Sequence, residues 1–125
     1  MPYPIYVVDE DGSVRDELDR VCEDHGGRCR GFARPDAFLH ALETLTVGCV
    51  LIDIRMPECA GLRLQAELLR RGSAMAVIAM SDSGGVEIAV KAMKLGALDF
   101  LEKPLMPDML LEALTLAMSR LARGA

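Results

Sequence analysis

The chain has 125 residues, 51% of them apolar, and a formal net charge of −5 at pH 7. This length and apolar fraction suit one domain with a single core, and the negative charge argues against direct nucleic-acid binding, which needs a basic surface. No apolar run in the sequence is long enough for a membrane helix, and the run at 5–8 is too short for a signal peptide, so we expect a cytoplasmic domain without membrane contact.

Short apolar runs alternate with longer amphipathic stretches, which is typical of an α/β domain with a parallel sheet covered on both faces by helices. Five strands are predicted, at 5–8, 29–32, 49–52, 76–80 and 98–101. Five helices are predicted, by apolar faces within 14–22 and 38–45, by the stretches 62–71 and 86–95, and by Pro107 at the start of a last helix. No repeat and no internal linker divides the chain.

The four cysteines form no Cys-x-x-Cys pair and no Cys/His spacing, so the sequence gives little support for a zinc site. We predict reduced thiols, some of them in the core. They are Cys22, Cys29, Cys49 and Cys59.

Polar side chains follow the carboxyl ends of four predicted strands, which is where ligands bind in sheets of this kind. In chain order, these side chains are Asp9, Glu10 and Asp11, then Asp53, Ser81 and Lys103. Because they come from separate strand ends at one edge of the sheet, we expect them to form one site.

Carboxylates that meet at one place resist ionisation unless a cation shares the site, and Mg²⁺ prefers oxygen ligands. We predict that Glu10 and Asp53 are direct ligands and that Asp9 binds directly or through water. The backbone carbonyl of Arg55 is a further predicted ligand. Asp11 is expected to cap the following helix instead. Considered alone, the acidic cluster is explained equally well by caps and solvated turn residues.

Asp53 is the predicted nucleophile, because a carboxylate can attack a phosphoryl donor and form an acyl phosphate. Lys103 and the metal would neutralise the charge that spreads over the phosphoryl oxygens. A lysine before a proline is usually a solvated loop residue. The position of Lys103 at a strand end, opposite Asp53, favours the functional interpretation.

Taken together, these motifs resemble the receiver domain of bacterial two-component response regulators. The matching segments are 7–11, 51–57 with Gly61, Ser81, and 96–104, and the stretch 89–97 is similar to receivers of the nitrogen-fixation regulator type, which control transcription. The resemblance implies a flavodoxin-like fold with strand order 2-1-3-4-5. It implies a single receiver domain over 1–125, with a DNA-binding output domain either outside this chain or absent from the protein.

The resemblance also implies that Asp53 takes phosphate from a partner sensor histidine kinase with Mg²⁺ required, and that the protein catalyses only phosphotransfer to, and hydrolysis from, its own aspartate. Ser81 would bind the phosphoryl group, Phe100 would be the aromatic switch, and the Lys103–Pro104 bond is expected to be cis. The surface of the fourth helix and fifth strand would then change, for dimerisation or contact with the output domain. Ile88, Met93 and Leu95 are candidates for that surface, although core packing explains each equally well.

Two positions depart from the usual pattern of this family. Glu10 stands where aspartate is more frequent, which can alter the metal coordination. Asp82 stands where alanine or glycine is favoured, and its charge could repel an incoming phosphate. Alternatively, Asp82 turns outward or caps the fourth helix.

Three other classes of protein share parts of this pattern. A haloacid-dehalogenase-type phosphatase needs a second acid two residues after the nucleophile, where this chain has Arg55. A flavin-binding electron carrier needs a phosphate loop after the first strand, where this chain has acids that repel phosphate. A receiver-like interaction module that is never phosphorylated remains the main alternative, because of Glu10 and Asp82.

Overall fold

The computed structural model of the chain describes residues 1–82 and 85–124. Five parallel strands form one sheet in the order β2-β1-β3-β4-β5, as predicted. The strands are β1 (Ile5–Val8), β2 (Cys29–Phe32), β3 (Cys49–Asp53), β4 (Ala76–Ser81) and β5 (Asp99–Glu102). The α-helices are α1 (Gly12–Asp24), α2 (Pro35–Ala41), α3 (Ala60–Arg70), α4 (Val86–Lys94) and α5 (Pro107–Ala122), and two short 3-10 helices are η1 (Leu42–Thr44) and η2 (Pro57–Cys59).

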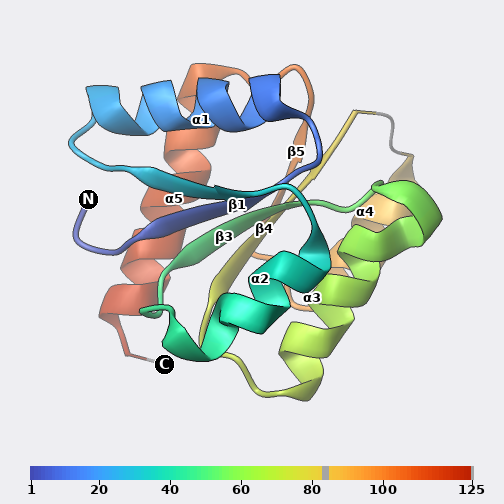
Figure 1. The fold of residues 1–125 in the computed structure, drawn as a ribbon. Coiled ribbons are helices and arrows are strands. Elements are labelled where there is room, and N and C mark those ends of the chain that lie inside the picture. Colours follow the sequence, from blue (N-terminus) through green and yellow to red (C-terminus); the bar gives the residue numbers. More distant parts are fainter. Residues whose placement is uncertain (83–84, 125) are drawn as a thin grey trace.

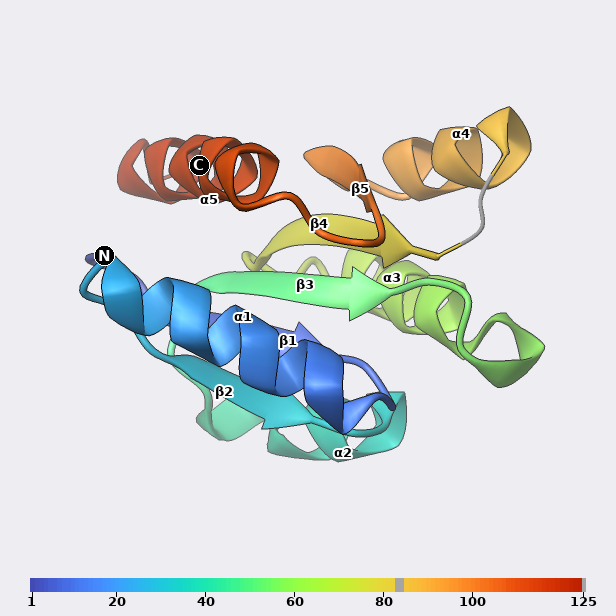
Figure 2. The same ribbon diagram turned by 90° about the horizontal axis from the view of Figure 1, so that it is seen from above.

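The helices cover both faces of the sheet, α1 and α5 on one and α2, α3 and α4 on the other (Figures 1 and 2). Alternation along the buried strands builds both cores. In β1, Ile5 and Val7 face the α1/α5 side, whereas Tyr6 and Val8 face the other side. Because both faces are covered, the central strands are continuous apolar runs, which is why the sequence predicted them well.

Strands β3, β4 and β5 each end one residue later than the apolar runs indicated. Asp53 pairs with Met80 in the ladder between β3 and β4, and Ser81 pairs with Glu102 in the ladder between β4 and β5. Backbone pairing therefore fixes the positions of both polar residues within the sheet itself.

Helix α1 begins with the predicted cap. The Asp11 carboxylate accepts hydrogen bonds from the backbone N–H of Ser13 at 2.9 Å and from its hydroxyl at 2.7 Å. These bonds hold the pKa of Asp11 below its usual value. In the described part of the chain, no helix is both long and apolar enough to cross a bilayer.

Candidate functional site

Three of the predicted site residues meet at the carboxyl edge of the sheet. The ammonium of Lys103, just after β5, lies 2.6 Å from an oxygen of Asp9 and 3.3 Å from an oxygen of Asp53. The side chains of Asp9 and Asp53 are only 1% and 11% exposed. Lys103 therefore joins the ends of β1, β3 and β5 in one partly buried cluster.

The two carboxylates are held in the same way. Asp9 accepts a hydrogen bond from the backbone N–H of Asp11 at 2.9 Å, and Asp53 accepts one from that of Arg55 at 2.9 Å. In both cases the donor lies two residues further along the chain, as in an Asx-turn. Each carboxylate thus has one oxygen fixed by its own loop, and the other directed at Lys103.

The environment keeps Lys103 charged. Burial, the largest single influence, lowers the pKa of its ammonium, but the hydrogen bond and charge of Asp9, followed by those of Asp53, raise the pKa overall. The Lys103 backbone N–H donates to the Ser81 carbonyl at 2.8 Å, and the Lys103–Pro104 bond is cis, which confirms the expectation for that bond. Lys103 is therefore positioned both by the contacts of its ammonium with Asp9 and Asp53 and by the hydrogen bond of its backbone N–H to Ser81.

The two predicted switch residues lie on neighbouring strands. Ser81 is completely buried at the end of β4, one position beyond the residue that pairs with Asp53. Phe100 is half-buried on β5 and packs against the core on the α2/α3/α4 face. In the sequence, the glycines at 84 and 85 also predict that the 81–85 segment takes part in the switch, but residues 83–84 lie outside the described residues.

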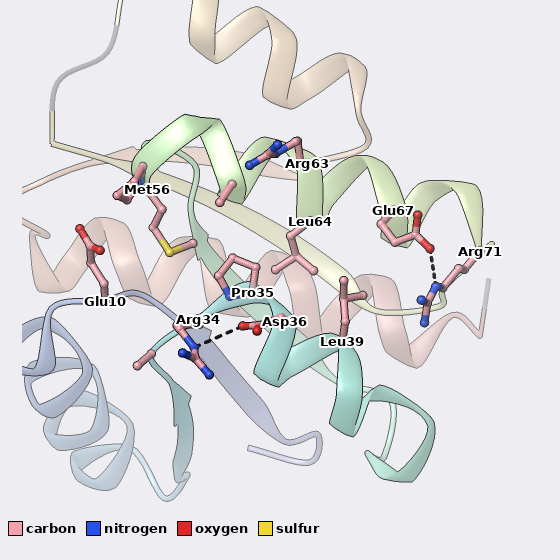
Figure 3. Close-up of a pocket in the computed structure, with 13 residues that line it drawn as sticks. Glu10, Arg34, Pro35, Asp36, Leu39, Met56, Arg63, Leu64, Glu67 and Arg71 are labelled. Carbon is pink, nitrogen blue, oxygen red and sulfur yellow. Dashed lines mark hydrogen bonds and ion pairs between the residues drawn. The ribbon is translucent and has the colours of Figure 1, made fainter.

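Glu10 lies apart from the Lys103 cluster. Its exposed side chain borders a hollow of about 560 Å³ between α2 and α3, which is also lined by Pro35, Met56 and Leu64 (Figure 3). Within residues 1–82 and 85–124, no three acidic, cysteine or histidine side chains are grouped closely enough to hold a metal ion. The acids at the site proper are Asp9 and Asp53.

A divalent cation still fits the donors that are present. Mg²⁺ typically takes one or two carboxylates and fills its remaining positions with water and phosphate oxygens. Asp9 and Asp53 provide two buried carboxylates that already share one cationic partner, Lys103. The turn that joins Asp53 to Arg55 keeps the Arg55 backbone at this edge of the sheet.

Asp82 is exposed, which agrees with the view that this side chain turns outward. The N-cap residue of α4 is Gly85, which has no side chain that could accept a cap hydrogen bond. Asp82 is therefore not the N-cap residue of this helix.

Two neighbours of the site were not assigned roles from the sequence. Arg15, on α1, donates a hydrogen bond to the Asp9 carbonyl at 2.6 Å and lies across Gly31 of β2. Gly61, in the first turn of α3, is so close to β3 that an added Cβ would overlap the carbonyl oxygen of Asp53. The position of Arg15 rests on a contact with β2, which is distant in the sequence, so it could not be predicted. The close approach at Gly61 could have been predicted from a small residue soon after Pro57.

Comparison with known proteins identifies the family. Residues 5–115 match the family model described as the response regulator receiver domain. The chain belongs to this family. Transcriptional regulatory protein FixJ of Azorhizobium caulinodans is 43% identical over 119 residues, which cover 95% of this chain and 56% of FixJ. Response regulator protein TmoT of Ectopseudomonas mendocina is 39% identical over 114 residues, which cover 91% of this chain and 52% of TmoT.

Solved structures agree with this membership. Full-length FixJ from B. japonicum superposes with a TM-score of 0.87 at 38% identity and covers 96% of this chain and 59% of that chain. The FixJ-N structure gives a TM-score of 0.85 at 31% identity, with 94% of each chain covered. The present chain spans about half the length of the curated relatives it matches. It is therefore a receiver domain of the kind found in transcriptional response regulators.

Proposed function

We propose that this receiver domain is a phosphoacceptor switch in which Asp53 takes phosphate from a sensor histidine kinase and α4 and β5 carry the signal to an output. The observation that carries the proposal is the contact of one ammonium, Lys103, with the carboxylates of both Asp9 and Asp53, at 2.6 and 3.3 Å. An acceptor carboxylate needs a cation nearby that can follow the charge onto the transferred phosphoryl group.

In the proposed reaction, a carboxylate oxygen of Asp53 attacks the phosphorus of a phosphohistidine. A new O–P bond forms while the P–N bond breaks, and its electron pair stays on the imidazole, which then takes up a proton. Lys103 can turn from the Asp53 oxygen to the phosphoryl oxygens with little movement, since it already lies 3.3 Å from that carboxylate. The Arg55 N–H keeps the other Asp53 oxygen in place.

Asp9, Asp53 and the Arg55 carbonyl would hold Mg²⁺, and Glu10 would join them only after turning away from the hollow beside α2. When bound, Mg²⁺ would offset the negative charge of the phosphoryl oxygens. Its requirement is therefore part of the proposal.

The signal would come from the contacts of the phosphoryl group with Lys103 and Ser81. Each charge-assisted hydrogen bond contributes about 1.5–3 kcal/mol, while reversing a 1:99 equilibrium needs about 5.5 kcal/mol. Lys103 already contacts two carboxylates. The free energy that it contributes is therefore the difference between these contacts and its contacts with the phosphoryl oxygens. The Ser81 hydroxyl would therefore have to supply much of the free energy that favours the phosphorylated conformation, and Phe100 would turn inward in response.

The output surface would be the outer side of α4 with β5, as a dimer interface or as a contact with a DNA-binding domain. Val86, Val90 and Met93 lie along α4 with 80%, 42% and 46% of their surface exposed. Among the residues named from the sequence, Met93 fits this role, whereas Ile88 packs against the core. Relatives named as transcriptional regulators support a transcriptional output.

The direct test is phosphorylation by a small phosphodonor with Mg²⁺, followed by intact-mass measurement. We expect a hydroxylamine-labile phosphate on the native chain, none on Asp53→Asn, none when EDTA is present, and full labelling of the matched variant Asp99→Asn. Failure to label the native chain would favour the alternative, an interaction module that is not phosphorylated. Equal labelling of Asp53→Asn would overturn the choice of acceptor.

A second test addresses Asp82. Its exposed carboxylate lies one residue beyond Ser81 and would repel an anionic donor. We expect Asp82→Ala to accelerate labelling by acetyl phosphate by roughly two- to threefold, because exposed charges interact by about 1 kcal/mol or less in water. Glu87→Ala, which removes an acid from the first turn of α4, is the control. An unchanged rate for Asp82→Ala would remove a gating role for this residue.

A further inference from the structure

Two cysteines, one in α1 and one in β2, face each other where the helix packs against the strand. Cys22 lies in the last turns of α1 and is completely buried, and Cys29 is the first residue of β2 and is half-buried. Their sulfur atoms are 2.7 Å apart. The chain between them reverses direction at Gly26, which has a positive φ of 77°.

We propose that Cys22 and Cys29 form an intramolecular disulfide when the protein meets hydrogen peroxide, so that this pair is an oxidative modification site. A disulfide bond is about 2.05 Å long, so the sulfurs need to approach by only about 0.65 Å (2.7 minus 2.05). Side-chain rotation can cover this distance without moving α1 away from β2. The bond would link residues seven positions apart.

Two contacts of Cys29 with α1 hold its sulfur close to Cys22 and favour this pairing. Its backbone N–H donates to the Asp19 carboxylate at 3.2 Å, and its thiol lies 3.6 Å from the Leu18 carbonyl. Both partners belong to α1, one turn before Cys22. The start of β2 is therefore held against the same helix that carries the second sulfur.

The chemistry balances with peroxide as the oxidant. The Cys29 thiolate attacks one peroxide oxygen, the O–O bond breaks, and the departing hydroxide is protonated to water. The resulting sulfenic acid is attacked by the Cys22 sulfur, so that the S–S bond forms, the S–O bond breaks, and a second water leaves with the remaining proton. Overall, two thiols lose two electrons and two protons, and peroxide is reduced to two waters.

Access and geometry assign these roles. Cys29 is the less buried member of the pair, so peroxide reaches it first. The Cys22 sulfur, 2.7 Å away, is then in place to attack a sulfenic acid on Cys29. The hydrogen bond with Cys22, followed by burial, raises the pKa of Cys29, so the first step is slow and needs sustained oxidant.

The other two cysteines provide controls. Cys49 is completely buried in β3, and burial raises the pKa of its thiol to about 12, so it should stay reduced in the folded protein. Cys59 is exposed and would instead react with solution oxidants or with a second molecule. Cys59→Ser therefore provides a clean background.

The experiment treats the folded Cys59→Ser chain with hydrogen peroxide and maps its peptides without reduction. We expect the loss of two thiols and of the mass of two hydrogen atoms, a peptide that links Cys22 to Cys29, and full reversal by dithiothreitol. Adding Cys22→Ser should replace the bond by a sulfenic acid at Cys29 that dimedone traps. Adding Cys29→Ser, at the more exposed position, should abolish the bond with less risk to folding.

Three results would overturn the proposal. These are a bridge that includes Cys49, further oxidation of Cys29 without a cross-link, and retention of both thiols after prolonged treatment of the folded chain with excess peroxide. As a second readout, the cross-link should raise Tm by roughly 5–10 °C, because it restricts the unfolded chain. An unchanged Tm in chains shown by mapping to be cross-linked would contradict a stabilising role.

Discussion

Helix α5 buries four side chains in the core, Leu110, Ala113, Leu114 and Ala117, whereas α4, on the other side of β5, buries only Ala92. Moreover, α4 exposes apolar side chains along its outer side, with Val86 80% exposed. A helix with few buried contacts needs little free energy to shift or open locally. Helix α5 therefore belongs to the permanent core, whereas few buried contacts oppose a shift of α4.

The attachment of α4 to α3 is also unusual. Gln65, completely buried in α3, donates through Nε2 to the Ala92 carbonyl at 2.6 Å. Its Oε1 is the one buried side-chain nitrogen or oxygen without a hydrogen-bond partner among the described residues. Besides the apolar packing of Ala92, α4 is therefore attached to α3 by a side-chain amide of which only the nitrogen is hydrogen-bonded.

The largest expected effect tests the anchoring of α5. Leu114→Ala removes a completely buried side chain and should lower the free energy of unfolding by about 3–5 kcal/mol. Leu116→Ala changes the same residue type in the same helix at a site that is 43% exposed, and should cost less than about 1 kcal/mol. Urea unfolding of both variants measures the two losses in unfolding free energy. Equal losses would contradict the view that α5 is anchored by its buried side chains.

The next prediction concerns the outer side of α4. Val90→Glu places a charge on this exposed surface and should weaken the dimer that the proposed function expects on phosphorylation by about tenfold or more, or about 1.4 kcal/mol. Its unfolding free energy should change by less than about 0.5 kcal/mol. Sedimentation with and without phosphodonor measures the first effect, with Leu69→Glu on α3 as the exposed control. Equal weakening by Leu69→Glu would show that α4 is not special.

A smaller effect is expected at the link between the helices. Gln65→Met removes both the bond to Ala92 and the unpaired Oε1, so global stability should change by at most about 1 kcal/mol in either direction. Amide exchange in α4 should nevertheless become several-fold faster, while that in α5 stays constant. If both helices respond alike, Gln65 does not hold α4 specifically.

The smallest effect is a pH response confined to α3. Hydrogen bonds from Arg70 and then Arg71 lower the pKa of Glu67 from 4.5 to about 2. The stabilisation is therefore complete above pH 4.5 and disappears as the pH falls toward 2. Amide exchange at the end of α3 should accelerate across this window, more than in α4 or α5, and Glu67→Gln should remove the pH dependence. A native-like pH response in that variant would assign it to another group.

Much of this architecture could be predicted from the sequence, because buried parallel strands are short apolar runs that few other structures explain. The last residues of β3 and β4 could not be predicted to belong to the sheet, because Asp53 and Ser81 are polar and only pairing with the neighbouring strands places them there. Strand β5 begins one residue later than predicted, because Leu98 bonds to Val77 before the Ile78–Asp99 pairing starts.

The candidate site was predictable to a similar degree. Asp9, Asp53 and Lys103 meet as their strand ends require. The direction of Glu10 could not be predicted, because a loop side chain has no periodicity that fixes where it points. Gln65 was hidden for a related reason, since a polar residue on an amphipathic helix is ordinarily assigned to solvent.

The close fit of Gly61 against the Asp53 carbonyl has a mechanical consequence. Because residue 61 has no side chain, the start of α3 lies directly against β3 and cannot move inward without displacing that strand. Under the proposed function, a displacement produced at Asp53 would therefore be resisted on the α3 side and would pass more easily across β4 toward α4, which buries few side chains.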